Sequence, residues 1–96
     1  MKAIIIESIN KKRVLEFTYD GGRRTVEPHC YGVNSKGNNA IRGFQTGGFS
    51  SSGKLGWKIF LQSEMTRLVM LEVEFEGPQK GYKKGDRAMT VIFCEL

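Results

Sequence analysis

The strongest constraint on the fold is an alternating segment that runs directly into a glycine-rich turn. In residues 14–19 every second side chain is apolar, and this period of two is typical of a half-buried β-strand. The sequence Asp-Gly-Gly follows at residues 20–22. Because glycine adopts positive φ at no steric cost, this tripeptide predicts a tight β-hairpin.

Short strands and turns continue along the chain. The next strand should begin near Arg23 and run through Val26. Pro28 cannot donate a hydrogen bond to a neighbouring strand, so it should mark a strand end or a sheet edge. Further strands are predicted at residues 39–45, 57–61, 68–75 and 89–96, with turns or loops at 34–38, 47–53 and 77–87.

Two segments carry more specific expectations. Residues 2–13 are interpreted as a short helix, because Ile5, Ile6 and Ile9 can share one face, although the isoleucine run also fits a strand. In residues 68–75 the alternation predicts one apolar face and one acidic face. Val69, Leu71, Val73 and Phe75 should point inward, whereas Glu72 and Glu74 should point outward.

These segments predict a mainly β (α+β) fold, either a small barrel of about five strands or a strongly bent sheet, with a short N-terminal helix. A length of 96 residues corresponds to a single domain, residues 1–96. A chain of this size can bury one modest core without disulfides or metal.

The net charge and the cysteine content limit which partners and cofactors we expect. The net charge of +5 attracts polyanions such as nucleic acid and nucleotides, although a charge of this size also serves solubility alone. Cys30 and Cys94 lie far apart, and with one histidine they make no zinc motif, so we expect no metal and no cofactor. No secretory signal and no run approaching roughly 20 apolar residues is visible, which predicts a reduced cytoplasmic protein without membrane contact.

Residues 48–54, Gly-Phe-Ser-Ser-Ser-Gly-Lys, match the first seven positions of a phosphate-binding P-loop. Leu55 stands where that motif needs Ser or Thr, and an alternating segment follows where it needs a helix. We therefore interpret the segment as a mobile hairpin loop, whose N–H and hydroxyl groups could still close over an anionic ligand.

His29, with Glu27 nearby, suggests a general base, but no nucleophile motif accompanies the pair. We therefore expect a binding protein with no catalytic residues. Arginine forks suit phosphate, and Tyr82 within a basic run suits stacking on a base, whereas Phe44 and Trp57 are expected in the core. The candidate ligand-binding residues are Arg23, Arg24, His29, Tyr31, Arg42, Gln45, Ser50, Ser51, Lys54, Lys58 and Tyr82.

The order of motifs resembles the WYL-domain family over about residues 3–68. The strand Leu-Glu-Phe-Thr-Tyr at 15–19, the glycine turn and Arg-Thr-Val-Glu-Pro at 24–28 resemble the opening of that domain. Residues 38–44 and Trp-Lys-Ile-Phe at 57–60 continue in register. Short stand-alone WYL-like proteins share segments that resemble Val-Glu-Pro-His-Cys-Tyr-Gly at 26–32 and the Gly81-Tyr82 pair.

The resemblance implies an Sm-like, SH3-type barrel of five strands and a ligand-sensing role. WYL domains occur mostly in bacterial transcription regulators and phage-defence proteins, where basic residues are thought to bind nucleic acid or nucleotide-like ligands. The family's name-giving triplet falls on Asn39-Ala40-Ile41, and its later arginine pair is absent from residues 60–65. Of the family's basic positions, Arg24 and, by neighbourhood, Lys58 carry over. No helix-turn-helix accompanies the domain.

Three functions remain open at this point. The first is non-enzymatic binding of a small anionic, nucleotide-like or cyclic-nucleotide-like ligand for sensing or sequestration, linked to phage defence or its evasion, with residues 46–54 as a lid. The second is binding of single-stranded DNA or RNA along the basic surface. The third is a protein-interaction module, which uses either an open barrel edge or a homodimer built on the apolar strand at 57–61.

Overall fold

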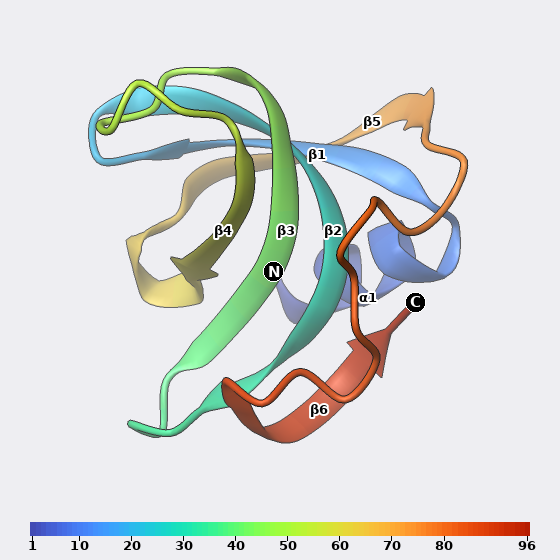
Figure 1. Ribbon diagram of the computed structural model, residues 1–96. Helices are drawn as coiled ribbons and strands as arrows, with labels where there is room; N and C mark the ends of the chain where they lie inside the picture. Colours follow the sequence, from blue (N-terminus) through green and yellow to red (C-terminus); the bar gives the residue numbers. More distant parts are fainter.

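The chain folds into one short helix followed by six antiparallel strands (Figure 1). The computed structural model describes all residues from 1 to 96. A 3₁₀ turn, η1 (Gln62–Glu64), connects the fourth strand to the fifth. The helix and strands are α1 (Lys2–Asn10), β1 (Arg13–Tyr19), β2 (Gly22–Asn34), β3 (Asn39–Gly48), β4 (Gly56–Leu61), β5 (Thr66–Glu74) and β6 (Met89–Glu95).

The strands form one sheet in the order β4-β3-β2-β1-β5, and β6 also pairs with β2. The long β2 therefore has two successive neighbours along one of its edges. Its residues 22–26 pair with β1, and its residues 30–34 pair with β6, while β3 runs along the other edge. This arrangement confirms the mainly β fold and the last predicted strand, near the C-terminus.

The sheet is strongly bent, but it is not closed into the barrel that the sequence suggested. Its edge strands, β4 and β5, do not pair with each other. The bend nevertheless brings β4 against β1, since the ring of Phe60 lies 5.0 Å from the rings of both Phe17 and Tyr19. The hydroxyl of Tyr19 accepts a hydrogen bond of 3.1 Å from the backbone N–H of Leu61. Side chains, rather than backbone pairing, thus hold the two strands together.

The core lies inside this bend, and α1 packs against it. Ile5 and Ile9 are fully buried one helical turn apart, which confirms the expected apolar face. The helix ends at Asn10, earlier than predicted, because Lys12 adopts a left-handed φ of 52° before β1 begins. The buried cluster consists of Ile5, Ile9, Leu15, Phe17, Val26, Tyr31, Ile41, Phe60 and Met65.

The expectation that Pro28 ends a strand is wrong, because β2 continues through it to Asn34. The alternative, an edge position, fits locally, because residues 27–29 lie between the pairings with β1 and β6 and have β3 as their neighbour on one side alone. Pro28 pairs with Gly43 and Cys30 with Arg42, so β2 holds one residue more than β3 at this point. That extra residue is His29. Such a β-bulge tolerates the missing N–H of proline within a paired strand.

The predicted faces of residues 68–75 are wrong only in part, because Phe75 is buried and Glu72 and Glu74 are exposed, as predicted. Val69 and Val73 are 47% and 60% exposed, whereas Leu68 and Met70 pack against the core. The register between β1 and β5 shifts twice, and Arg67 has a φ of 55°. These irregularities in β5 break the strict alternation on which the prediction depended.

After β5, residues 75–88 have no regular secondary structure, as predicted for residues 77–87. They cross β2 and lead into β6 (Figure 1). We call these residues the crossing loop. None of the helical segments has the length and apolar character that a bilayer-spanning helix requires.

Two glycines allow the packing of β2 against β6 to be tested. A Cβ atom on Gly32 would overlap the backbone carbonyl oxygen of Val91, whereas one on Gly47 would make ordinary contact with Thr25 at 3.8 Å. We expect Gly32→Ala to lower the free energy of unfolding by about 2 kcal/mol or more, because two backbones must separate. Urea unfolding monitored by circular dichroism measures this.

The matched control is Gly47→Ala, which should stay within about 0.5 kcal/mol of wild type. Equal stabilities of the two variants would contradict the pairing of β2 with β6.

Candidate functional site

The crossing loop is held to the sheet by a cluster of aromatic side chains, which we call the outer aromatic cluster. His29 lies at its centre, with ring centroids 4.7 Å from Trp57, 5.2 Å from Tyr82 and 5.8 Å from Phe75. Tyr82 also stacks on Trp57 at 6.3 Å. Residues from β2, β4 and the loop thus meet around one buried imidazole.

Both nitrogens of the His29 ring have partners within the protein. Nε2 accepts a hydrogen bond of 3.0 Å from the backbone N–H of Gln79, so Nε2 carries no proton. Nδ1 is then the protonated nitrogen, and it donates to the carbonyl of Glu27 at 2.8 Å. Burial lowers the pKa of His29, because the charged imidazolium would lose its hydration. The imidazole is therefore neutral and serves as an anchor for the loop.

Further bonds fix the loop beyond Gln79. The indole N–H of Trp57 donates to the carbonyl of Lys80 at 3.0 Å, and the hydroxyl of Tyr82 donates to the carbonyl of Leu96 at 3.1 Å. Gly81 lies between them with a φ of +92°, a conformation that L side chains rarely adopt. The chain can therefore pass close to the indole before it turns.

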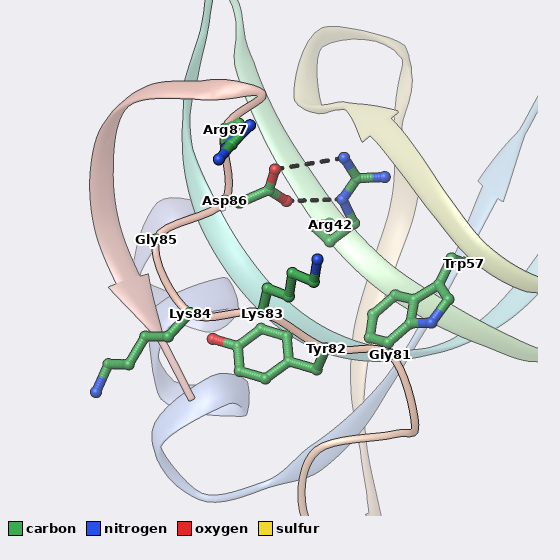
Figure 2. Close-up of a pocket in the computed structure, with 9 residues that line it drawn as sticks. All are labelled: Arg42, Trp57, Gly81, Tyr82, Lys83, Lys84, Gly85, Asp86 and Arg87. Atoms are coloured by element: carbon green, nitrogen blue, oxygen red, sulfur yellow. Dashed lines mark hydrogen bonds and ion pairs between the residues drawn. The ribbon is translucent and has the colours of Figure 1, made fainter.

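Next to this anchor lies an open cavity of about 560 Å³, which we call the basic cavity (Figure 2). Four of its side chains are cationic and one is a carboxylate, so its charge is strongly positive. Two aromatic side chains, from β4 and from the loop, contribute to its wall. The lining residues are Arg42, Trp57, Gly81, Tyr82, Lys83, Lys84, Gly85, Asp86 and Arg87.

An ion pair orients the arginine of this cavity. Nε of Arg42 donates to Asp86 at 2.7 Å, and Nη2 donates to the other carboxylate oxygen at 3.4 Å. The hydrogen bond from Arg42 lowers the pKa of Asp86, which also accepts the N–H of Ala88 at 2.9 Å. A guanidinium has five N–H donors, so Arg42 keeps three that Asp86 does not use.

Figure 2 shows how the free cations lie around the cavity. The ammonium of Lys83 points into the space between Arg42 and the two aromatic rings, whereas Lys84 points away from it. An anion next to Lys83 could thus reach Arg42, while a flat group could contact the exposed part of Trp57. This arrangement suits a ligand that combines negative charge with an aromatic ring.

The structure divides the predicted ligand-binding residues among several places. Arg42 and Tyr82 line the basic cavity, and His29 lies beneath it in the outer aromatic cluster. Tyr31 is fully buried in the core, where its hydroxyl donates to the side chain of Gln62. Arg23 is exposed and pairs with Glu16 at 3.4 Å. The cavity lining does not include His29, Tyr31 or Arg23.

The other predicted residues gather at the hairpin between β3 and β4. Arg24 and Gln45 are buried and hydrogen-bonded to each other at 3.2 Å. The ammonium of Lys58 donates to the hydroxyl of Ser50 at 2.8 Å. Ser51 and Lys54 are exposed on the connecting loop. This group is separate from the basic cavity, with which it shares no residue.

Sequence reasoning missed five side chains of the cavity, namely Trp57, Lys83, Lys84, Asp86 and Arg87. The three cations were visible as a basic run around Tyr82, a pattern typical of nucleic-acid or nucleotide contacts. Trp57 was expected in the core but is only half-buried. Asp86 gave no local signal, because its partner Arg42 is 44 residues away in the chain.

Comparisons with known proteins gave no match, whether to a family model, to a curated protein or to a solved structure. No group of three or more His, Cys, Asp and Glu side chains is placed to hold a metal ion.

The neutral state of His29 predicts how stability depends on pH. The folded-state pKa lies below the ordinary value of 6.5, so the unfolded chain takes up a proton first as the pH falls. The free energy of unfolding should therefore be highest above pH 6.5 and fall with acidification below it, by at most about 1.4 kcal/mol per pH unit. Chemical unfolding at pH 7.5, 6.5 and 5.5 measures the slope.

The control is His29→Phe, which keeps a ring in the outer aromatic cluster but cannot titrate. Because the chain has one histidine, this variant should lose the slope between pH 6.5 and 5.5. The same slope in both proteins would show that His29 is not the group responsible.

Proposed function

We propose that the protein binds a small anionic ligand of the nucleotide class in the basic cavity, and that it senses or sequesters this ligand without chemical change. The observation that carries the proposal is one open cavity lined by four cationic residues, of which Lys83 points inward, and by two aromatic side chains. Phosphate would interact with the cations, and a base would stack on the exposed part of Trp57.

The volume of the cavity and the fixed positions of its side chains support this proposal. A volume of about 560 Å³ falls within the range of about 300–1,000 Å³ typical of small-molecule sites. Arg42 is already oriented by Asp86, and the crossing loop is anchored by His29, so little ordering is needed when a ligand binds.

Membership of the WYL-domain family, with its links to phage defence, is part of the same proposal. It is supported by the quoted motifs, which fall on β1 to β4 in the expected order after a short helix. The basic position carried over from the family, Arg24, is not in the basic cavity. The proposed ligand site therefore uses none of the basic positions carried over from the family, although Arg42, Trp57, Gly81 and Tyr82 lie in the quoted segments.

Single-stranded DNA or RNA is the second candidate ligand. Lys80 and Lys84 favour it, because they are exposed on the crossing loop and could extend the phosphate contacts beyond the cavity. Several phosphate contacts would make the affinity fall steeply with salt. Between 50 and 200 mM salt, an oligonucleotide bound along the loop should lose far more affinity than an enclosed mononucleotide.

The proposal is tested with Lys83→Met, which removes a cation that points into the cavity. Loss of one charge-assisted hydrogen bond should weaken nucleotide binding roughly tenfold. Trp57 is the one tryptophan of the chain, so quenching of its fluorescence during titration with a nucleotide panel reports binding at the cavity wall.

The matched control is Lys36→Met, since Lys36 is exposed on the turn between β2 and β3 and does not line the cavity. It should bind as wild type does. If no nucleotide or short oligonucleotide alters the fluorescence of the wild-type protein, the proposed function is wrong.

A further inference from the structure

The protein contains a second group of cations, at the hairpin between β3 and β4, that has no acidic partner. The side chain of Arg24 is 97% buried, with 3% of its surface exposed. The three ion pairs of the protein involve other residues, so no carboxylate lies within 4.0 Å of its guanidinium. Buried arginines are almost always paired with an acid, because a charge loses its hydration on burial.

Only neutral groups surround the Arg24 guanidinium. Nε and Nη2 donate to the carbonyl of Tyr19 at 3.4 and 3.3 Å, and Nη1 donates to the amide oxygen of Gln45 at 3.2 Å. The rings of Tyr19, Phe49 and Phe60 lie 5.3–5.7 Å from it. These contacts hold the guanidinium in place and leave two of its five N–H donors without a bond.

A second uncompensated cation lies on the same face of the sheet. In the pairing of β3 with β4, Gln45 is opposite Gly56 and Gly43 is opposite Lys58. Directly opposed residues point to the same face, so Lys58 shares the face of Gln45 and therefore of Arg24. The Lys58 ammonium donates to the hydroxyls of Ser50 and Ser52 at 2.8 and 3.4 Å, and no carboxylate contacts it.

The ring of Phe49 lies against the Arg24 guanidinium. The backbone of Phe49 is held on both sides, since its N–H donates to the carbonyl of Arg23 at 2.8 Å and its carbonyl accepts from Gln45 at 2.8 Å. The ring lies against Gly22, where a Cβ atom would overlap it, and the side chain remains 47% exposed. Of the three rings around the guanidinium, that of Phe49 is the most exposed.

We propose that Arg24, Lys58 and the hydroxyls of Ser50 and Ser52 form a second anion site, which takes a phosphate or phosphomonoester when the Phe49 ring turns aside. The two free N–H groups of Arg24 supply a planar fork, and Lys58 supplies a point charge. The site shares no residue with the basic cavity, so the two can be tested apart.

The experiment is a titration of ¹⁵N-labelled protein with inorganic phosphate, followed by NMR of the arginine Nε–H and tryptophan indole signals. A saturable shift of the Arg24 Nε–H signal reports the second site, whereas the Arg42 Nε–H and Trp57 indole signals report the basic cavity. Phe49→Ala should bind phosphate at Arg24 more tightly than wild type, because no ring has to move. Since the side chain of Phe49 is half exposed, this variant should keep the fold.

Adding Lys58→Met to Phe49→Ala should weaken phosphate binding at Arg24 roughly tenfold, as expected for the loss of one charge-assisted hydrogen bond. Adding Lys36→Met to Phe49→Ala should have no effect. Absence of an Arg24 shift in Phe49→Ala, or an equal affinity with and without Lys58, would overturn the second site. A response confined to Arg42 and Trp57 would also overturn it, while supporting the basic cavity.

Discussion

The position of the crossing loop, and with it the basic cavity, depends on the hydrogen bond between His29 and Gln79. The β-bulge after Pro28 inserts His29 as an extra residue of β2, at the point where its neighbour changes from β1 to β6. The imidazole then accepts the N–H of Gln79 and contacts three aromatic rings. Because its second nitrogen is bonded to the backbone of Glu27, this histidine has no free nitrogen with which to act as a base.

Most of the fold could be predicted from local sequence, because hairpin turns and alternating side chains are local signals. The helix, the β1–β2 hairpin, β3, β4 and β6 all follow from such signals. The errors have a common cause, since the bulge at His29 and the register shifts of β5 depend on the neighbouring strands. Pro28 looked like a strand end because its sequence does not show that β3 provides a one-residue-shorter partner. Whether the sheet closes into a barrel likewise depends on how its edge strands meet, which local sequence does not show.

The site was predictable only where its residues are close in sequence. The basic run around Tyr82 was visible, and so was the arginine fork of Arg42, but nothing in the sequence joins them. The ion pair between Arg42 and Asp86 joins the arginine to the basic run. Trp57, which is 25 residues before Tyr82 in the chain, lines the same cavity. The predicted set therefore mixed residues of the cavity with those of the β3–β4 hairpin, because one-dimensional charge patterns do not separate two sites on one small sheet.

The two arginines show how differently a small protein can stabilise a cation. Arg42 is partly exposed and lies against a carboxylate, so water and Asp86 share its stabilisation and its outer N–H groups stay open. Arg24 is buried and depends on carbonyl oxygens, an amide oxygen and aromatic faces, none of which carries a full negative charge. An incoming anion would add to a partial charge compensation at Arg42, whereas at Arg24 it would supply the counter-charge that the fold omits. The same guanidinium chemistry thus gives one site that is open and already neutralised in part, and one that is closed and electrostatically incomplete.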